Sequence, residues 1–171
     1  MKTFSYKCTM VMLALVTSGC AGLAEMKPVE RIGAAETTMA LVNFARPRVF
    51  AGDGVKLEVW DGANFVGTLK AGTMVQYVAL PGDHVFMIDP TQEQPWGYMN
   101  INLEAGKVYY IKPNLIPFVG LMLGVASSSD SRIEEWNTSL EPMAVDRSTT
   151  RPVPQERIDE AKRNLDKFKK P

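Results

Sequence analysis

Between residues 38 and 111 the chain is divided into short segments of strand character, and this pattern constrains the fold more than any other feature. In VKLEVW, at residues 55–60, valine, leucine and valine alternate with lysine, glutamate and tryptophan. A period of two places such side chains on opposite faces of a β-strand. Turn-forming residues separate the segments, as in DGAN at 61–64 and PGD at 81–83. Short strands at this spacing predict a mainly β fold, an antiparallel β-sandwich.

Eight segments carry this strand character, and we expect each of them to form a strand. They are residues 39–45, 55–60, 65–69, 73–80, 84–88, 99–103, 108–111 and 133–140. The last would close the sandwich, with Trp136 buried. The side chains expected in the core are Leu57, Val59, Val78, Phe86, Ile101, Leu103, Tyr110 and Ile111. Only packing can stabilise this core, because no cysteine follows residue 20 to form a disulfide within the domain.

Both cysteines of the chain, Cys8 and Cys20, lie within the first 20 residues. A cysteine nucleophile, a thiolate zinc site and a disulfide framework are therefore excluded from the domain that follows. Lysine plus arginine and aspartate plus glutamate both total 19, so the net charge is zero. Because this balance creates no strong field, we expect no nucleic-acid partner.

The first 19 residues have the pattern of a secretory signal peptide. Two lysines precede the apolar run TMVMLALV, at 9–16, which is too short to span a bilayer as a helix. The segment VTSGC, at 16–20, resembles the bacterial lipobox, whose cysteine receives fatty acyl chains such as palmitate and becomes the first residue after cleavage. We therefore predict lipidation at Cys20, with the membrane as a partner through the acyl chains. The alternative is a plain secretory signal with an incidental cysteine.

The composition of successive segments predicts the organisation of the chain. Residues 1–19 would be the lipoprotein signal peptide, 20–37 a lipid-anchored flexible tether, 38–145 the β-sandwich domain, and 146–171 a linker with an amphipathic helix. Ala21 follows the cysteine, and by the sorting rule of enteric-type bacteria this favours the outer membrane, with the domain facing the periplasm.

Two segments stand apart from the strand pattern. A helix is expected at 155–169, after two prolines, and its apolar stripe consists of Ile158, Ala161, Leu165 and Phe168. A helix this short is marginal alone, so the stripe should dock on the sandwich. The other segment, IPFVGLMLGVA at 116–126, is almost wholly apolar. It predicts a buried strand or packed loop, with an exposed lip that contacts lipid or a partner as the alternative.

Several motifs resemble those of DUF2846, a bacterial lipoprotein family of unknown function. They lie in residues 55–86 and 101–113 and comprise GTL at 67–69, LPG at 80–82 and LEAGKVYY at 103–110. The resemblance covers about half of the chain. It implies a small sandwich of the transthyretin or immunoglobulin type, and it implies no catalytic residues.

The sequence offers few candidates for chemistry. His84, the only histidine, follows a turn, where a partly exposed structural role is expected rather than that of a base. The motifs of serine hydrolases, zinc peptidases and P-loop proteins are absent from the sequence. A pair of turn carboxylates is left open, but no pair stands out. We therefore predict no enzymatic activity, no cofactor and no metal site.

Three aromatic residues are candidate contacts for a ligand or a partner. Trp60 lies on the polar face of its predicted strand, while Trp96 and Tyr98 belong to a predicted loop, QPWGY at 94–98. Exposed aromatic rings can stack on sugars or anchor a protein partner. The alternative role for all three is packing in the core or in a crevice.

These observations predict a lipid-anchored periplasmic β-sandwich that acts as a non-catalytic binding or scaffolding module, with an envelope protein as a possible partner. Two alternatives stay open: a component of a secretion or envelope-assembly complex, and a protein that binds cell-wall glycans.

Overall fold

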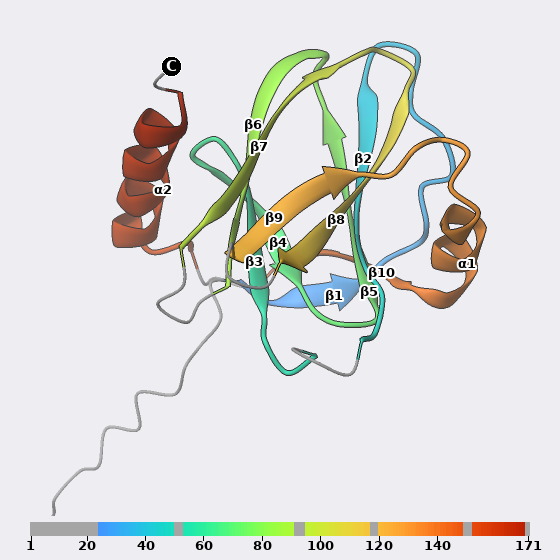
Figure 1. The fold of residues 1–171 in the computed structure, drawn as a ribbon, viewed down its shortest axis with the longest axis horizontal. Helices are drawn as coiled ribbons and strands as arrows, with labels where there is room; N and C mark the ends of the chain where they lie inside the picture. Colours follow the sequence, from blue (N-terminus) through green and yellow to red (C-terminus); the bar gives the residue numbers. More distant parts are fainter. Residues whose placement is uncertain (1–23, 50–52, 91–94, 117–119, 149–151, 170–171) are drawn as a thin grey trace, which may run out of the picture.

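The computed structural model describes residues 24–49, 53–90, 95–116, 120–148 and 152–169. Cys20 and the predicted signal peptide at 1–19 lie outside the described residues. The described part of the chain forms two β-sheets and two helices (Figure 1). The fold is therefore mainly β with a C-terminal helix, as the sequence predicts.

The larger sheet has six strands in the order β1-β10-β5-β2-β8-β9. Their bounds are β1 Met26–Pro28, β2 Ala40–Arg46, β5 Thr73–Ala79, β8 Val108–Ile116, β9 Gly120–Val125 and β10 Glu141–Val145. Two of the neighbouring pairs, β10 with β5 and β2 with β8, are parallel, so the prediction of a purely antiparallel fold is wrong for this sheet. Parallel neighbours need a crossover. Strand β8 follows a strand of the other sheet, and β10 follows a helix, so each crossover runs outside the sheet.

The smaller sheet has four strands in the order β4-β3-β6-β7, and all its pairs are antiparallel. Their bounds are β3 Leu57–Asp61, β4 Asn64–Leu69, β6 Gly82–Asp89 and β7 Gly97–Leu103. A register shift between Val59 and Trp60 marks a bulge in the pairing of β3 with β4. These strands are the ones whose alternation and turns are clearest in the sequence.

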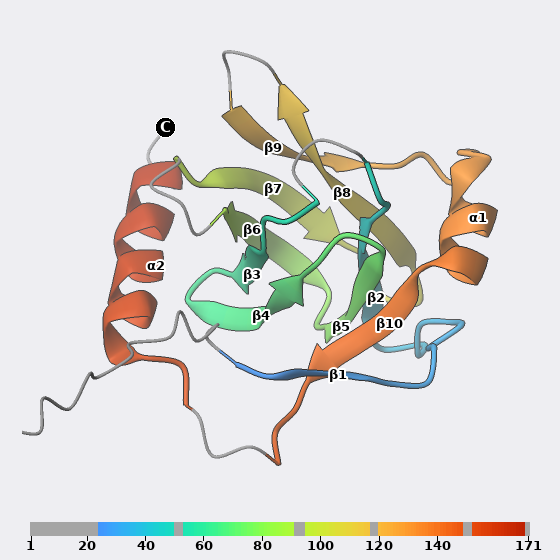
Figure 2. The same cartoon turned by 90° about the horizontal axis from the view of Figure 1, so that it is seen from below.

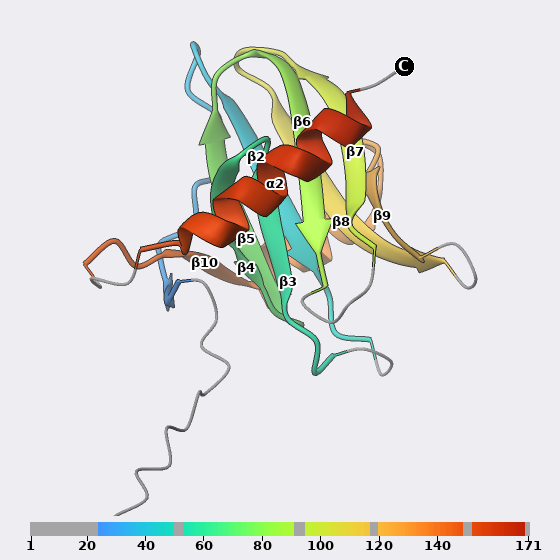
Figure 3. The same ribbon diagram turned by 90° about the vertical axis from the view of Figure 1, so that its left-hand side faces the viewer.

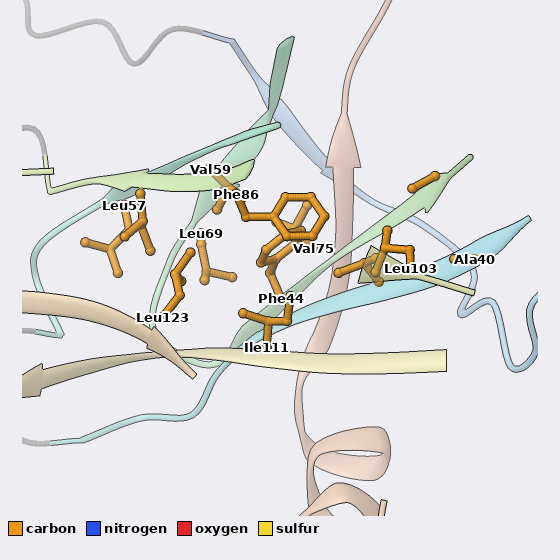
Figure 4. Close-up of a cluster of buried hydrophobic side chains, with 13 residues drawn as sticks. Ala40, Phe44, Leu57, Val59, Leu69, Val75, Phe86, Leu103, Ile111 and Leu123 are labelled. Atoms are coloured by element: carbon orange, nitrogen blue, oxygen red, sulfur yellow. The ribbon is translucent and has the colours of Figure 1, made fainter. Parts of the chain in front are cut away.

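The core lies between the two sheets, and Figure 4 shows side chains from both converging there. The rings of Phe44 on β2 and Phe86 on β6 meet edge to face with centroids 5.1 Å apart. Five of the expected core residues are buried in this cluster: Leu57, Val59, Phe86, Leu103 and Ile111. Ile101 is partly buried against it.

Val78 and Tyr110 are not part of this core, contrary to the sequence prediction. Val75 and Ala79 of β5 belong to the core, so alternation places Val78 on the outer face of the sheet, where it is 39% exposed. Tyr110 packs instead with a second cluster on that outer face, built around Trp136.

The predicted closing strand at 133–140 is a helix, α1, at Arg132–Ser139. Ile133, Trp136 and Leu140 are spaced as one helical face and pack against the outer face of the larger sheet. Trp136 is buried, as predicted, at 2% exposure. The strand that follows, β10, pairs with β5 and with β1.

The predicted tether at 20–37 is in part a structured portion of the domain. Residues 26–28 form β1, which pairs with β10. Farther along, Arg31 donates a hydrogen bond to the carbonyl oxygen of Leu140 at 2.6 Å, and the Ile32 amide donates to Gln76 Oε1 at 2.8 Å. This segment has no periodicity of its own. It is ordered by hydrogen bonds to the backbone of β10 at the sheet edge and to groups on the outer face of the larger sheet.

The apolar segment at 116–126 contains the edge strand β9, and its residues 117–119 lie outside the described part. Leu123 faces the core, whereas Met122 and Val125 are 43% and 48% exposed. Gly97 of β7 lies against the backbone of Leu121, so the edges of the two sheets meet along this side. The segment is thus a half-buried strand over Gly120–Val125.

Helix α2 spans Gln155–Phe168, close to the predicted range. Figure 3 shows it lying diagonally across the outer face of the four-stranded sheet. In Figure 2 the helices α1 and α2 occupy opposite sides of the molecule. The predicted apolar stripe faces the sheet, where Ala161 is buried and Ile158, Leu165 and Phe168 are partly buried.

Candidate functional site

Helix α2 covers the outward-facing side chains of β3 and β6, and this decides the role of Trp60. Trp60 and Met87 are fully buried beneath the helix. The Trp60 ring packs against Phe65 and Trp96, with centroids 5.2 Å and 6.0 Å away. Alternation places Trp60 on the outer face of β3 as the sequence indicates, but α2 seals that face. Trp60 is therefore a packing residue in this structure and is not available to stack on a sugar or anchor a partner.

The other two candidate aromatics lie beside the same helix. Trp96 is partly buried, and the Arg157 guanidinium lies 5.4 Å from its ring centroid. Tyr98 is 44% exposed and stacks on Phe168 of α2, with centroids 4.0 Å apart and planes 9° from parallel. Trp96 immediately precedes β7, and Tyr98 belongs to it, so the predicted loop ends earlier than expected.

A charged cluster fixes the first turn of α2 to the sheet. Arg157 donates hydrogen bonds to Glu58 Oε2 at 2.6 Å, to Asp89 and to Glu160. The side chains of Glu58 and Asp89 are each only 6% exposed. Burial raises the pKa of Glu58, although the hydrogen bond and charge of Arg157 oppose the change. Burial acts to lower the pKa of Arg157, but its bonds to the two sheet carboxylates outweigh this effect and raise it.

An open groove lies between the C-terminal end of α2 and the strands β6 and β7. Its volume is about 670 Å³, within the range of pockets that hold small molecules. The lining residues are Asp61, Gly62, Asp83, His84, Val85, Asn100, Ile101, Asn102, Leu165, Phe168 and Lys169. The groove therefore combines a polar side, from the strands, with an apolar side, from the helix.

Adjacent side chains of β6 and β7 form the floor of the groove. The register pairs Asp83 with Asn102 and Val85 with Asn100. Asn102 Nδ2 donates a hydrogen bond to Asp83 Oδ1 at 2.7 Å. Asp83, Asn100 and Asn102 are all exposed. The floor thus presents one carboxylate and two carboxamides to solvent on a rigid antiparallel pair.

One edge of the groove is formed by Asp61 and His84, which are tied into the fold. Asp61 Oδ2 accepts a hydrogen bond from the Tyr77 hydroxyl at 2.9 Å and lies 2.8 Å from His84 Nδ1. His84 Nε2 donates to the carbonyl oxygen of Leu80 at 2.8 Å. Burial, followed by the charge of Asp61, raises the pKa of the Tyr77 phenol. Both ring nitrogens of His84 are engaged, so it has a structural role in this arrangement and is not a free base.

Among the described residues, no group of three histidine, cysteine, aspartate or glutamate side chains is placed to hold a metal ion. Sequence reasoning missed Asp83, Asn100 and Asn102 as candidate contacts. The alternation in residues 99–103 places Asn100 and Asn102 on one face, but only the strand pairing brings Asp83 beside Asn102. The groove itself exists only because α2 docks beside them. Cys20, the candidate lipidation site, lies outside the described residues.

Comparison with family models, curated proteins and solved structures finds no match to this chain. Neither helix in the described ranges has the length and apolar character required to cross a membrane.

Proposed function

We propose that the protein is a lipid-anchored, non-catalytic binding module of the bacterial envelope, which holds a small polar ligand in the groove beside the C-terminal end of α2. The observation that carries the proposal is the groove. It places exposed hydrogen-bonding groups of Asp83, Asn100 and Asn102 opposite an apolar wall from Leu165 and Phe168. A few polar groups converging on a largely preformed apolar concavity are typical of small-molecule sites.

The rigidity of the groove also favours binding. Its floor is an antiparallel strand pair, and its wall is a helix held by an apolar stripe and by the Arg157 cluster. A preformed site loses little conformational entropy when a ligand binds. Both ring nitrogens of His84 are already within hydrogen-bonding distance of Asp61 and Leu80, which favours binding over catalysis at this groove.

The proposed location rests on the sequence. The VTSGC segment ending at Cys20 is the basis for an acyl anchor, and Ala21 favours the outer membrane with the domain in the periplasm. The two stacked sheets are compatible with the sandwich that the DUF2846-like motifs imply. That resemblance, and the transthyretin or immunoglobulin type of the sandwich, are part of the proposal.

The binding site is tested by NMR on the mature chain carrying Cys20→Ser, with a library of small polar metabolites as probes. Binders should shift the backbone amide signals of residues 83, 100 and 102. Asn100→Trp should abolish the shifts by filling the groove, while Glu134→Ala, on the exposed face of α1, should leave them intact. Binding confined to other surfaces, or no binding from the whole library, would overturn the proposed site.

The anchor is tested in living cells with an alkyne analogue of palmitate. Wild-type protein and Cys8→Ser should both incorporate the label and fractionate with membranes, because Cys8 belongs to the predicted leader. Cys20→Ser should lose the label and leave the membrane fraction. A Cys20→Ser protein that still fractionates with membranes would show that another part of the chain anchors it.

A further inference from the structure

We infer that the ligand of the groove is a neutral saccharide, bound with its hydroxyl groups on the β6–β7 floor and one ring face toward α2. This inference rests on the proposed function and names the ligand class of that same site.

The floor has the hydrogen-bonding character that neighbouring hydroxyl groups require. The bond from Asn102 Nδ2 to Asp83 Oδ1 holds a carboxylate and a carboxamide side by side at 2.7 Å. It leaves Asp83 Oδ2 and Asn102 Oδ1 as acceptors and the second Asn102 N–H as a donor. A hydroxyl group both donates and accepts, so a pair of adjacent hydroxyls can use the donor and an acceptor at once. A ligand with acceptors alone would offer no donor to Asp83 Oδ2.

Asn100 extends this row along the strand. It lies two residues from Asn102 on the same face of β7, about 7 Å away by strand geometry. Within the described part of the chain, no hydrogen bond engages the Asn100 side chain. Its amide therefore offers a further donor and acceptor to a hydroxyl on the far side of a sugar ring.

The charges that line the groove oppose an anionic ligand. Asp83 is exposed on the floor, and Asp61 stands at the edge. Lys169, at the end of α2, is the one lysine or arginine among the lining residues. A cationic ligand would find Asp61 already bonded to Tyr77 and His84, and Asp83 shared with Asn102. A neutral polyhydroxylated molecule can form hydrogen bonds with the floor residues without charge repulsion and without competing for carboxylates that are already bonded.

The apolar wall suits the C–H face of a sugar ring. Phe168 lines the groove, and its ring is held by stacking on Tyr98 at a centroid separation of 4.0 Å. Leu165 and Val85 extend the apolar area beside it. An aromatic ring of fixed orientation contributes contact area with little loss of side-chain freedom. Tyr98, a contact candidate from the sequence, would act here as a positioning residue behind Phe168.

Saturation-transfer NMR on the mature Cys20→Ser chain tests the inference. The saccharide probes are cellobiose, maltose and N,N′-diacetylchitobiose, and the non-saccharide probes are trialanine and citrate. At least one disaccharide should receive saturation from the protein and shift the amide signals of residues 83, 100 and 102. Asn100→Ala and Asp83→Asn should each weaken its affinity by about tenfold, the loss expected for a hydrogen bond to a charged or fixed partner. Glu134→Ala is the matched surface control.

The outcomes separate this inference from the proposed function. If trialanine or citrate shifts the groove residues and none of the disaccharides does, the saccharide class is wrong while the groove stands as a binding site. If a disaccharide binds but Asn100→Ala and Asp83→Asn bind it as tightly as wild type does, the floor is not its site and the inference fails. Circular dichroism of each variant shows that the fold is retained, which the exposure of both side chains leads us to expect.

Discussion

Replacing Arg157 by methionine should destabilise the domain severely, because two sheet carboxylates depend on this guanidinium. Glu58 and Asp89 are almost inaccessible to solvent, and Arg157 bonds to both. Methionine keeps the length and apolar body of the side chain but removes its charge and its donors. The variant would leave two carboxylates buried beneath α2 without their shared cation.

The expected loss follows from the geometry of this cluster. Breaking a buried, hydrogen-bonded ion pair by removing one partner typically costs about 3–5 kcal/mol. The Arg157 side chain is 20% exposed, so water can reach the vacated space and the lower end of that range is expected. For a domain of this size, a loss of about 3 kcal/mol lowers the melting temperature by roughly 6–12 °C.

Urea unfolding and thermal melts measure this loss of stability. The loss should also depend on pH in a way that identifies its cause. Burial raises the folded-state pKa of Glu58 above 4.5, and removal of Arg157 raises it further. A carboxyl with a raised folded pKa contributes stability below its unfolded pKa, and this contribution is lost as pH rises through the folded pKa. The deficit of Arg157→Met relative to wild type should therefore be largest near neutral pH and shrink as pH falls toward 4.5.

Two comparison variants test the role of the Arg157 charge. Arg163→Met changes an exposed arginine on the same helix and should alter the free energy of unfolding by less than about 0.5 kcal/mol. Adding Glu58→Gln to Arg157→Met should recover part of the loss, since one buried charge disappears. If Arg157→Met and Arg163→Met have the same free energy of unfolding, the buried carboxylates do not depend on Arg157. The same conclusion follows if the loss of stability in Arg157→Met is equal at pH 5 and pH 7.

Two further predictions concern packing. Gly97→Ala should lower the free energy of unfolding in urea by about 1–3 kcal/mol, because a Cβ there would come within 2.2 Å of the Leu121 carbonyl oxygen. Gly33→Ala is the matched control, because a Cβ at residue 33 would face open space. Equal losses in the two variants would contradict the close approach of β7 and β9. Trp136→Ala should cost about 3–5 kcal/mol by the same assay, since the indole fills the interface of α1 with the larger sheet. A Trp136→Ala protein as stable as wild type would mean that α1 contributes little to the fold.

Local patterns predict a large part of this fold. Alternation at 55–60 places Leu57 and Val59 in the core and Trp60 on the opposite face, and the helical spacing from Ile158 to Phe168 predicts α2 and its apolar side. These features depend on neighbours within one strand or one helix, which is the range over which a periodicity acts.

The misassigned features depend on partners that are distant in sequence. Trp60 is covered by residues of α2 about 100 positions later, so the sequence of β3 does not indicate that this side chain is buried. Strand β1 is three residues long and forms only because β10 offers an edge. The segment with α1 has apolar residues at 133, 136 and 140, a helical spacing that its β-branched and aromatic content obscured. The groove could not be predicted from local patterns for the same reason, because one of its walls is the docked helix α2.

The pairing of β1 with β10 sets how far the domain could stand from a membrane. The backbone is tied to the domain already at residue 25, whose carbonyl oxygen accepts a hydrogen bond from the amide of Asp146. With an acyl anchor at Cys20, only the five residues 20–24 would separate lipid from fold, and five residues reach at most about 18 Å at full extension. Such a short tether would keep the domain close to the bilayer and raise its local concentration toward molecules held there. Ligands displayed at the membrane would be encountered often, whereas ligands farther away would have to diffuse to it.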